Sequence, residues 1–193
     1  EFVFKLKYAR YNEKEKRRET WSESVYRYTA MLKRKFPSEI EEIENVEDAI
    51  LEKRILPSMR GLQFGGDGIE RKNMRMYNCT SSFCDRPRFF AEALWLLLCG
   101  SGVGFSVQKH HVASLPPVRA PEGEEFLFIV PDSIEGWADA VNWLIMSYLG
   151  NYAPVIFDFS EIRPAGAPLS VGGTAPSYKP LKKALDHIEP ILR

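Results

Sequence analysis

Three cysteines, at positions 79, 84 and 99, are the side chains best suited to chemistry in this sequence. A structural zinc ion takes four ligands, usually from two close pairs, and neither Cys99 nor the neighbouring His110 and His111 has the spacing to complete such a set. A disulfide between Cys79 and Cys84 would have to join a strand end to a helix start, which disulfide geometry rarely allows. Two interpretations of Cys79 stay open, a small buried hydrophobe and a redox thiol, whereas Cys84 and Cys99 are predicted to be buried.

A glycine- and proline-rich loop, IRPAGAPLSVGGT at 162–174, is a second candidate site. Arg163 offers a planar guanidinium to a phosphate, and Gly172 and Gly173 leave backbone N–H groups open to an anion. The loop is therefore either a phosphate-binding element or an ordinary connection. The GSGVG run at 100–104 follows a predicted helix and precedes a strand, which is the reverse of the order in a dinucleotide-binding fingerprint.

Helical periodicity dominates the first 56 residues. A helix is predicted over 13–36, with a capping box of Thr20 and Glu23 at an internal restart. A second helix is predicted up to residue 56, with Ser38 and Glu41 as its cap. The chain is thus divided into a helical layer at 1–56 and a second part at 57–193, which opens with a glycine-rich loop at 57–68.

Strands and apolar helices alternate in the second part. A strand at 75–83, a helix at 86–99 capped by Asp85, and a strand at 102–107 predict a parallel crossover. A helix that begins at a capping box of Asp132 and Glu135 and ends at Leu149 follows, and then a strand at 154–162. A last helix from residue 181 places four apolar residues on one side, namely Leu181, Leu185, Ile188 and Leu192. The fold class is therefore α/β.

The composition fits one packed domain, or at most two, in 193 residues. The 26 basic residues balance the 26 acidic ones, which removes the overall field that would attract nucleic acid or an anionic membrane. The longest apolar runs, FFAEALWLLLC and AVNWLIMSYL, are about half as long as the roughly 20 residues that span a bilayer. An odd, low cysteine count favours a reducing compartment, so we expect a cytoplasmic protein. The chain lacks a first Met and stops within a helical pattern, so we expect a piece of something larger.

Several motifs stand in a characteristic order. They are RRETW (17–21), LPSMRGLQFGG (56–66), NCTSSFCDRPRFFAEALWLLLCGSGVGFSV (78–107), DSIEGW (132–137) and FDFSEIRPAGAPLSVGGTA (157–175). This ordered set, which covers essentially the whole chain, resembles the adenosylcobalamin-dependent, class II ribonucleotide reductases of the monomeric ribonucleoside-triphosphate type. The resemblance implies a ten-stranded α/β barrel behind a helical layer, of which this chain would supply the layer and the first strands.

The resemblance also implies roles for individual residues. Cys79 matches the cysteine of the family's NC motif, one of two thiols that reduce the ribose 2′ carbon and end as a disulfide. Substrate contacts are expected from the residues around it and from the preceding and following motifs, namely Ser58, Asn78, Thr80, Gly102 and Gly104. The loop matches the segment that binds a deoxynucleoside triphosphate effector, with Arg163, Gly172, Gly173 and Lys179 as phosphate contacts and Lys182 as a helper. Pro176 and Tyr178 depart from the family's usual loop and put the choice of effector in doubt.

The family's radical cysteine, its second reducing thiol and most of its cobalamin pocket lie downstream of the matched motifs. We therefore expect a complementary polypeptide that completes the barrel, adenosylcobalamin bound mainly outside this chain, and a thioredoxin-like reductant. No metal site is expected in this chain itself. Three rival interpretations stay open: a non-catalytic fragment that binds nucleotide or partner in regulation or assembly, a reductase with a different radical source, and a stand-alone nucleotide-binding domain.

Overall fold

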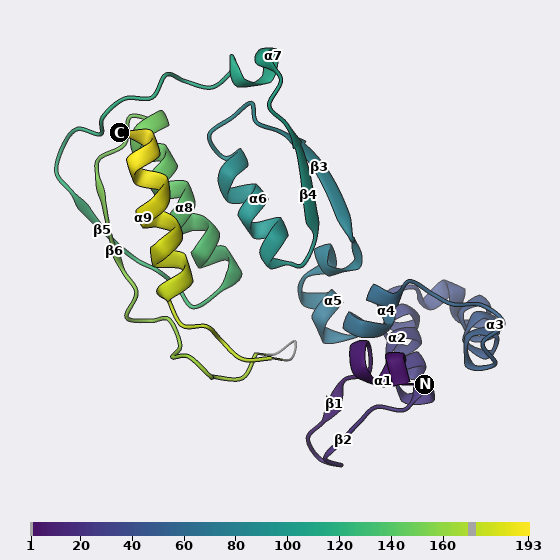
Figure 1. Ribbon diagram of the computed structural model, residues 1–193. Coiled ribbons are helices and arrows are strands. Elements are labelled where there is room, and N and C mark those ends of the chain that lie inside the picture. Colours follow the sequence, from purple (N-terminus) through teal and green to yellow (C-terminus); the bar gives the residue numbers. More distant parts are fainter. Residues whose placement is uncertain (1, 170–172) are drawn as a thin grey trace. The chain divides into compact units, whose positions relative to one another are not determined.

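The computed structural model describes residues 2–169 and 173–193, which form two compact units (Figure 1). The described part of the first unit ends at Asn78, and the second contains Cys79–Leu169 and Gly173–Arg193. The first unit extends beyond the predicted helical layer at 1–56, because short helices after residue 57 pack against the long helix of that layer.

The first unit is helical, with one small β-hairpin. Its long helices α2 and α3 pack side by side, and α4 packs against α2. The elements in chain order are α1 (Phe2–Lys7), β1 (Tyr11–Asn12), β2 (Arg17–Arg18), α2 (Trp21–Lys35), the 3₁₀ turn η1 (Pro37–Glu39), α3 (Ile40–Leu51), α4 (Met59–Phe64), α5 (Asp67–Arg71) and the 3₁₀ turn η2 (Asn73–Met76).

The predicted helix at 13–36 is wrong in its first part. Residues 11–18 form the β1–β2 hairpin, in which the Asn12 side chain accepts hydrogen bonds from the N–H groups of Lys14 and Glu15. Asparagine commonly closes a turn in this way, in competition with a helix. The capping box of Thr20 and Glu23 is present as predicted, but it begins α2 rather than restarting a longer helix.

Two further predictions about the first unit are wrong. Ser38 does not cap α3, because its hydroxyl donates to the carboxylate of Glu39 and the helix begins after a 3₁₀ turn. The glycine-rich stretch at 57–68 is largely helical, since α4 and the start of α5 lie within it. Burial accounts for this: Leu62 and Ile69, one from each short helix, are buried inside the unit.

A small core joins α2, α3 and α4. Val25, Ile50 and Leu62 are completely or almost completely buried and contact one another. Trp21 packs on this cluster and donates from its indole N–H to the carbonyl of Ile50, which ties α2 to α3. Trp21, Val25 and Tyr28 thus lie on the face of α2 that packs in this core.

The second unit alternates strands and helices. It contains two pairs of parallel strands, and each pair is connected through one long apolar helix. Its elements are β3 (Cys79–Phe83), α6 (Phe89–Leu98), β4 (Gly102–Ser106), α7 (Lys109–Val112), β5 (Phe126–Ile129), α8 (Ile134–Leu149), β6 (Val155–Asp158) and α9 (Lys179–Leu192). The predicted parallel crossover from β3 through α6 to β4 is confirmed.

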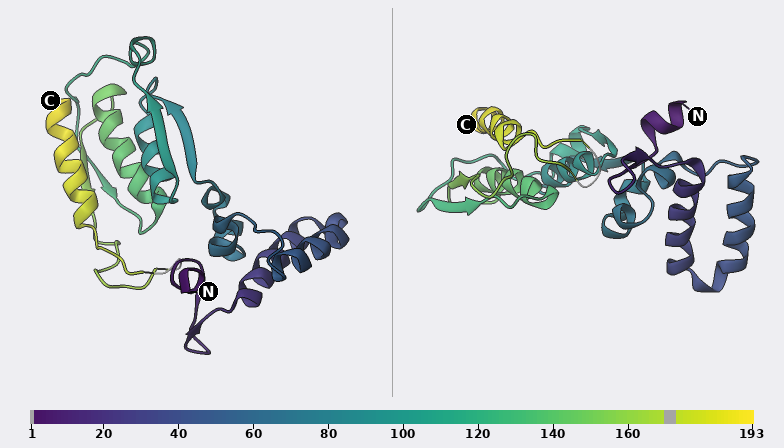
Figure 2. Two further views of the ribbon diagram at one scale, coloured as in Figure 1. Left: turned by 45° about the vertical axis from the view of Figure 1, so that its right-hand side comes forward. Right: turned by 90° about the horizontal axis from the view of Figure 1, so that it is seen from below.

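Helix α8 lies at the centre of the second unit, with α6 and α9 packed against it (Figure 1 and Figure 2). The core consists of α8 residues together with Val130, Leu181 and Leu185. The apolar side predicted for the last helix is confirmed, because Leu181 and Leu185 are buried and Ile188 and Leu192 pack against the same core. An α/β fold is thus confirmed.

Three details of the second unit differ from the prediction. Helix α6 begins three residues later than predicted, because Asp85 pairs with Arg86 and does not cap it. Helix α8 is capped by Ser133, whose hydroxyl accepts from the N–H of Gly136, and not by Asp132. Strand β5 was not predicted, because FLFI is apolar throughout and shows no alternation that would distinguish a strand.

Candidate functional site

Cys79 is the first residue of β3 and is exposed in this chain. Its register partner on β4 is Gly102, which has no side chain to cover the sulfur. Thr80, the next residue, donates its hydroxyl to the carbonyl of Gly102 at 3.3 Å. The thiol at the start of β3 is therefore accessible and flanked by a glycine.

The parallel register sorts the residues of β3 and β4 onto two faces. Residues paired across parallel strands share a face, and successive residues alternate between faces. Phe105 lies on the face turned toward α6, since its ring is 5.2 Å from that of Phe89. Thr80, Ser82 and Val103 share that face, so the Thr80 hydroxyl is directed away from the Cys79 thiol. Any contact of Thr80 with a ligand beside Cys79 must come from its backbone.

We call the opposite face the cysteine face; it contains Cys79, Ser81 and Phe83 of β3 with Gly102, Gly104 and Ser106 of β4. Gly104 is not required by packing, because a Cβ at this position would meet only the carbonyl oxygen of Thr80, at an ordinary 3.8 Å. The missing side chains at 102 and 104 leave room beside the thiol. An accessible sulfur, a hydroxyl and bare backbone on one face can accommodate a polar small molecule.

The far end of the cysteine face carries His111. Its Nδ1 lies 2.9 Å from the hydroxyl oxygen of Ser106, and its ring lies 4.5 Å from that of Phe83 and 4.0 Å from that of His110. The two histidines belong to the short helix α7, and Ser106 and Phe83 hold His111 against the end of the sheet. This contact closes one end of the cysteine face.

Cys84 and Cys99 are buried, as predicted. Burial raises the pKa of the Cys84 thiol, and the nearby Asp85 carboxylate raises it further, so little of it ionises. Cys84 follows the last residue of β3, and five residues of strand place it about 16 Å along the chain from Cys79. That separation excludes a disulfide between them, which needs Cα atoms within about 7 Å. Among residues 2–169 and 173–193, no three metal-binding side chains form a cluster that could hold a metal ion.

Ser58 and Asn78 belong to the first unit, and both are exposed. Ser58 directly precedes α4 and makes no capping hydrogen bond with its hydroxyl. The side-chain oxygen of Asn78 accepts a hydrogen bond of 2.7 Å from Nε of Arg60, on α4. The structure thus connects α4 to the residue that directly precedes Cys79.

The described residues of the loop between β6 and α9 are joined by backbone hydrogen bonds. The N–H of Ala175 donates to the carbonyl of Ala167, and Pro168 pairs with Thr174 in an antiparallel bridge. Gly173 adopts a φ of +87°, which glycine tolerates without strain. Gly172 lies outside the described residues. Lys179 is the first residue of α9, and Lys182 forms an ion pair with Asp186.

Arg163 is held by Asp132, whose carboxylate accepts from its Nε at 2.5 Å. A second, longer bond of 3.4 Å runs from Nη1 to the carbonyl of Pro168. The guanidinium is therefore oriented at the base of the loop, with part of its donor edge committed to a carboxylate. An anion would have to share this guanidinium with Asp132, a partner that the sequence did not reveal because it lies 31 positions away.

No family model matches the chain. A probable adenosylcobalamin-dependent ribonucleoside-triphosphate reductase of Dictyostelium discoideum is 29% identical, in an alignment that covers all of this chain and 30% of that protein. An adenosylcobalamin-dependent ribonucleoside-triphosphate reductase of Euglena gracilis is 29% identical over 79% of this chain and 22% of its own length. The chain is related to the class II ribonucleotide reductases. The resemblance predicted from the motifs is thereby confirmed.

The fold agrees with this relationship. A crystal structure of a B12-dependent, class II ribonucleotide reductase superposes with a TM-score of 0.87 at 24% identity, over 99% of this chain and 36% of that one. The chain thus spans about a third or less of the length of the reductases it matches. None of the helices among the described residues is long and apolar enough to cross a membrane.

Proposed function

We propose that this chain supplies the amino-terminal part of a ribonucleoside-triphosphate reductase, with Cys79 as one of its two reducing thiols. In the reaction, the 2′ hydroxyl of a ribonucleotide leaves as water and a hydrogen takes its place. Two thiols provide the two electrons and become one disulfide, which a thioredoxin-like protein or another dithiol then reduces. The second thiol would come from a complementary polypeptide.

The cysteine face is the observation that carries this proposal. A thiol that donates electrons to a ribose carbon must be accessible, and Cys79 is the exposed cysteine of the three. Gly102 and Gly104 leave space beside it, and Ser81 adds a hydroxyl on the same face. Substrate contacts are proposed for Asn78, Thr80, Gly102 and Gly104, and for Ser58 in the first unit.

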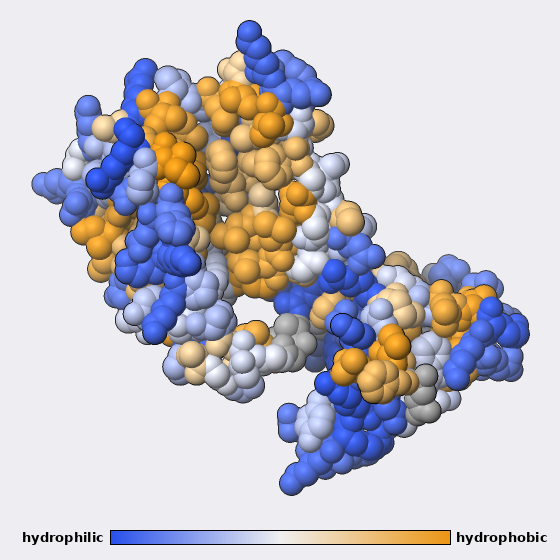
Figure 3. All heavy atoms as spheres, viewed as in Figure 1, coloured by the Kyte–Doolittle hydropathy of each residue, from blue (hydrophilic) through white to orange (hydrophobic). Residues whose placement is uncertain are grey.

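The complementary polypeptide is supported by helix α6. A helix that is apolar all round is normally buried, but only Phe89 and Ala91 of α6 are buried here. Leu97 is 53% exposed, and the space-filling view shows hydrophobic residues gathered over this helix (Figure 3). We propose that the further barrel strands and helices of the reductase cover these surfaces and complete the ten-stranded barrel around the cysteine face.

An effector site is proposed at the loop after β6. Arg163, held in place by Asp132, and the backbone at Gly173 would contact the phosphates of a deoxynucleoside triphosphate, with Gly172 and Lys179 as further contacts. The backbone hydrogen bonds that join residues 166–169 to residues 173–175 support this assignment, because a binding loop needs a defined backbone. Lys182 is less available than the others, since Asp186 pairs with it.

Adenosylcobalamin, when bound to the complete reductase, would supply the radical that starts the reaction. Three cavities among the described residues of the second unit are lined by charged, aliphatic and aromatic side chains, from α6, α8, α9, β5, β6 and the loops beside them, and nothing in these linings is specific for a corrin ring. The residues that hold the cofactor are therefore proposed to lie mainly outside this chain.

Reconstitution tests the proposed function. The chain is mixed with the downstream polypeptide, adenosylcobalamin, a dithiol and a ribonucleoside triphosphate, and deoxynucleotide formation is measured. We expect activity from the mixture and only background from Cys79→Ser, because a hydroxyl cannot form a disulfide. Cys84→Ala is the matched control, since this thiol is buried and lies beyond the cysteine face.

Two results would contradict the proposal. Full activity with Cys79→Ser would assign this chain a role in assembly or nucleotide binding without electron transfer. Activity that requires a di-iron subunit in place of adenosylcobalamin would assign it to a reductase with another radical source.

A further inference from the structure

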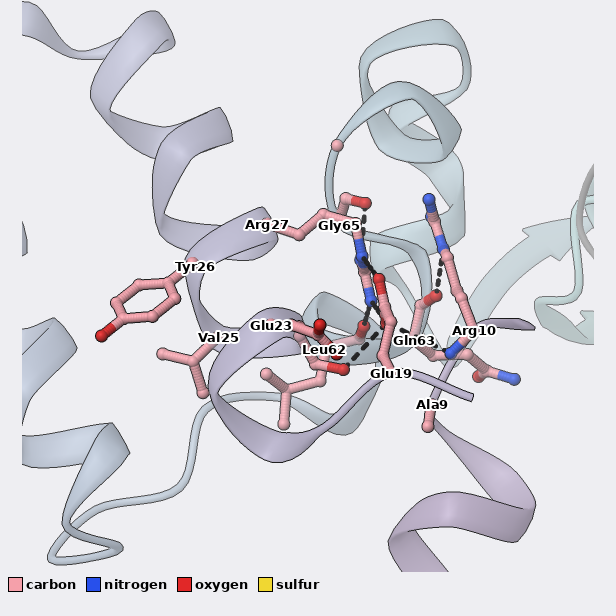
Figure 4. Close-up of polar contacts among 12 residues, drawn as sticks. Ala9, Arg10, Glu19, Glu23, Val25, Tyr26, Arg27, Leu62, Gln63 and Gly65 are labelled. Carbon is pink, nitrogen blue, oxygen red and sulfur yellow. Dashed lines mark hydrogen bonds and ion pairs between the residues drawn. The ribbon is translucent and has the colours of Figure 1, made fainter. Parts of the chain in front are cut away.

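Three charged residues of the first unit form a cluster between the β-hairpin, α2 and α4 (Figure 4). Arg27 pairs with Glu19 through Nε and Nη2, at 2.7 and 2.8 Å from the two carboxylate oxygens. Glu19 also accepts from the backbone N–H of Arg10 and from the Ser24 hydroxyl. The side chains of Arg27 and Glu19 are only 17% and 13% exposed, so this ion pair is largely shielded from water.

The cluster holds the carboxyl end of helix α4. Arg27 donates from Nη2 to the carbonyl of Leu62 at 2.8 Å and from Nη1 to the carbonyl of Gly65 at 2.7 Å. Arg10 donates from Nε to the carbonyl of Gln63 at 3.1 Å. The last carbonyls of a helix have no partner within it, and cationic side chains both satisfy them and complement the negative end of the helix dipole. Two arginines therefore fix the end of α4.

Helix α4 also lies unusually close to α2. A Cβ at Gly61 would come within 2.9 Å of the Tyr28 ring, and one at Gly65 within 3.2 Å of the Tyr28 backbone. Leu62, between them, is completely buried. The helix is held by close packing along one side and by Arg27 and Arg10 at its end, which leaves it little freedom to move within the unit.

Helix α4 also contacts the segment that precedes the reactive cysteine. Ser58 precedes α4, and Arg60 within it donates to the Asn78 side chain at 2.7 Å. Phe64, the last residue of α4, contacts the guanidinium groups of Arg60 and Arg75, at 5.5 and 5.8 Å from its ring centre. Contacts from α4 thus reach η2 and the residue before Cys79.

We propose that Arg10, Glu19 and Arg27 are positioning residues, which hold α4 in the arrangement that binds substrate. Through the bond from Arg60 to Asn78, α4 in turn holds residues 73–78, the segment that directly precedes Cys79. The inference rests on the proposed function for the roles of Ser58 and Asn78 alone. The physical part, that the cluster orders α4 and residues 73–78, follows from the contacts within the first unit.

Amide hydrogen exchange tests the physical part in the chain alone. Arg27→Gln removes the bonds to Leu62 and Gly65 and leaves Glu19 without its main partner. We expect exchange in Met59–Phe64 and in residues 73–78 to become about 10- to 100-fold faster, the factor expected for losing charge-assisted hydrogen bonds. Exchange in α9, in the other unit, should not change.

Arg34→Gln is the matched control. Arg34 is another α2 arginine in an ion pair, with Glu70 at 2.9 Å, but this pair is exposed and touches no carbonyl of α4. Equal acceleration in α4 by Arg34→Gln and Arg27→Gln, or no acceleration by Arg27→Gln, would overturn the inference. If Arg27→Gln does not fold, two milder variants carry the test: Arg27→Lys keeps the charge, and Arg10→Gln removes only the bond to Gln63. Each should accelerate α4 exchange less than tenfold but measurably.

The reconstituted reductase tests the functional part. We expect Arg27→Gln to raise KM for the ribonucleotide more than it lowers kcat, and Arg27→Lys to restore part of the loss, because a charged group again reaches Glu19. Faster exchange with an unchanged KM would overturn the link to substrate binding while the ordering of α4 stands. A wild-type mixture without activity would instead refute the proposed function and leave the exchange result intact.

Discussion

Gly104 offers a substitution that separates folding from substrate access. A Cβ at this position meets only one backbone oxygen at 3.8 Å, and Gly104 does not have a positive φ, so Gly104→Ala fits the native backbone. Replacing glycine where the backbone permits it stabilises a protein by about 0.4–1 kcal/mol, through the unfolded chain. The melting temperature should therefore stay the same or rise by about 1–4 °C.

The same methyl group projects onto the cysteine face beside the Cys79–Gly102 pair. Crowding a fitted site by one to three carbons costs about 1–3 kcal/mol, which corresponds to a loss of about 5- to 150-fold in kcat/KM. We expect Gly104→Ala at the lower end and Gly104→Val at the upper end, measured as deoxynucleotide formation by the reconstituted reductase.

Gly136→Ala is the contrasting variant. A Cβ there would overlap the backbone oxygen of Pro131, so this change should lower the melting temperature. If Gly104→Val folded normally and kept the wild-type kcat/KM, the cysteine face would not be the surface that meets the substrate, and the reasoning from its open backbone would be wrong.

Other measurements address the remaining features. Iodoacetamide should label Cys79 in the folded chain and label Cys84 and Cys99 only after unfolding, as mass spectrometry can show; rapid labelling of all three would contradict their burial. Leu62→Ala should lower the free energy of unfolding by about 2–5 kcal/mol in denaturant titrations, because the side chain is completely buried, and a loss below about 1 kcal/mol would mean that the α2–α4 core is loosely packed. Burial raises the pKa of Glu19, but its hydrogen bonds and its attraction to Arg27 together lower the pKa by more than burial raises it. The net pKa of Glu19 therefore lies below its ordinary 4.5. Its stabilising contribution is present above pH 4.5 and is lost as the pH falls through the lower folded pKa, so Glu19→Gln should flatten the acid side of the melting-temperature profile.

Local signals in the sequence predicted much of the second unit. Periodicity and the residues at element ends predicted three of its features. These are the apolar helix that ends at Leu149, the crossover between β3 and β4, and the buried side of α9. Strand β5 was missed because a continuous apolar run of four residues carries no period, and its partner β6 lies some 29 positions later in the register.

The first unit shows where local signals fail. The β1–β2 hairpin replaces a helix because Asn12 closes a turn, and the glycine-rich stretch becomes helical because Leu62 finds a core formed by Val25 and Ile50. The pairing of Arg27 with the carbonyls of α4 depends on residues 35 and 38 positions apart, which no local pattern records. For the candidate site, the sequence indicated Cys79 and Arg163 but not Asp132 or Arg60, since their partners are set by the fold.

The uneven placement of the cysteines has a practical consequence. Two of the thiols are buried and one is at the surface, so air can oxidise only the surface thiol of a folded, purified sample. Two molecules can then form a disulfide with each other through this cysteine. Samples handled without a reductant should therefore accumulate a covalent dimer at Cys79, and a band of twice the mass on a non-reducing gel would be an inexpensive first sign that this sulfur is reachable.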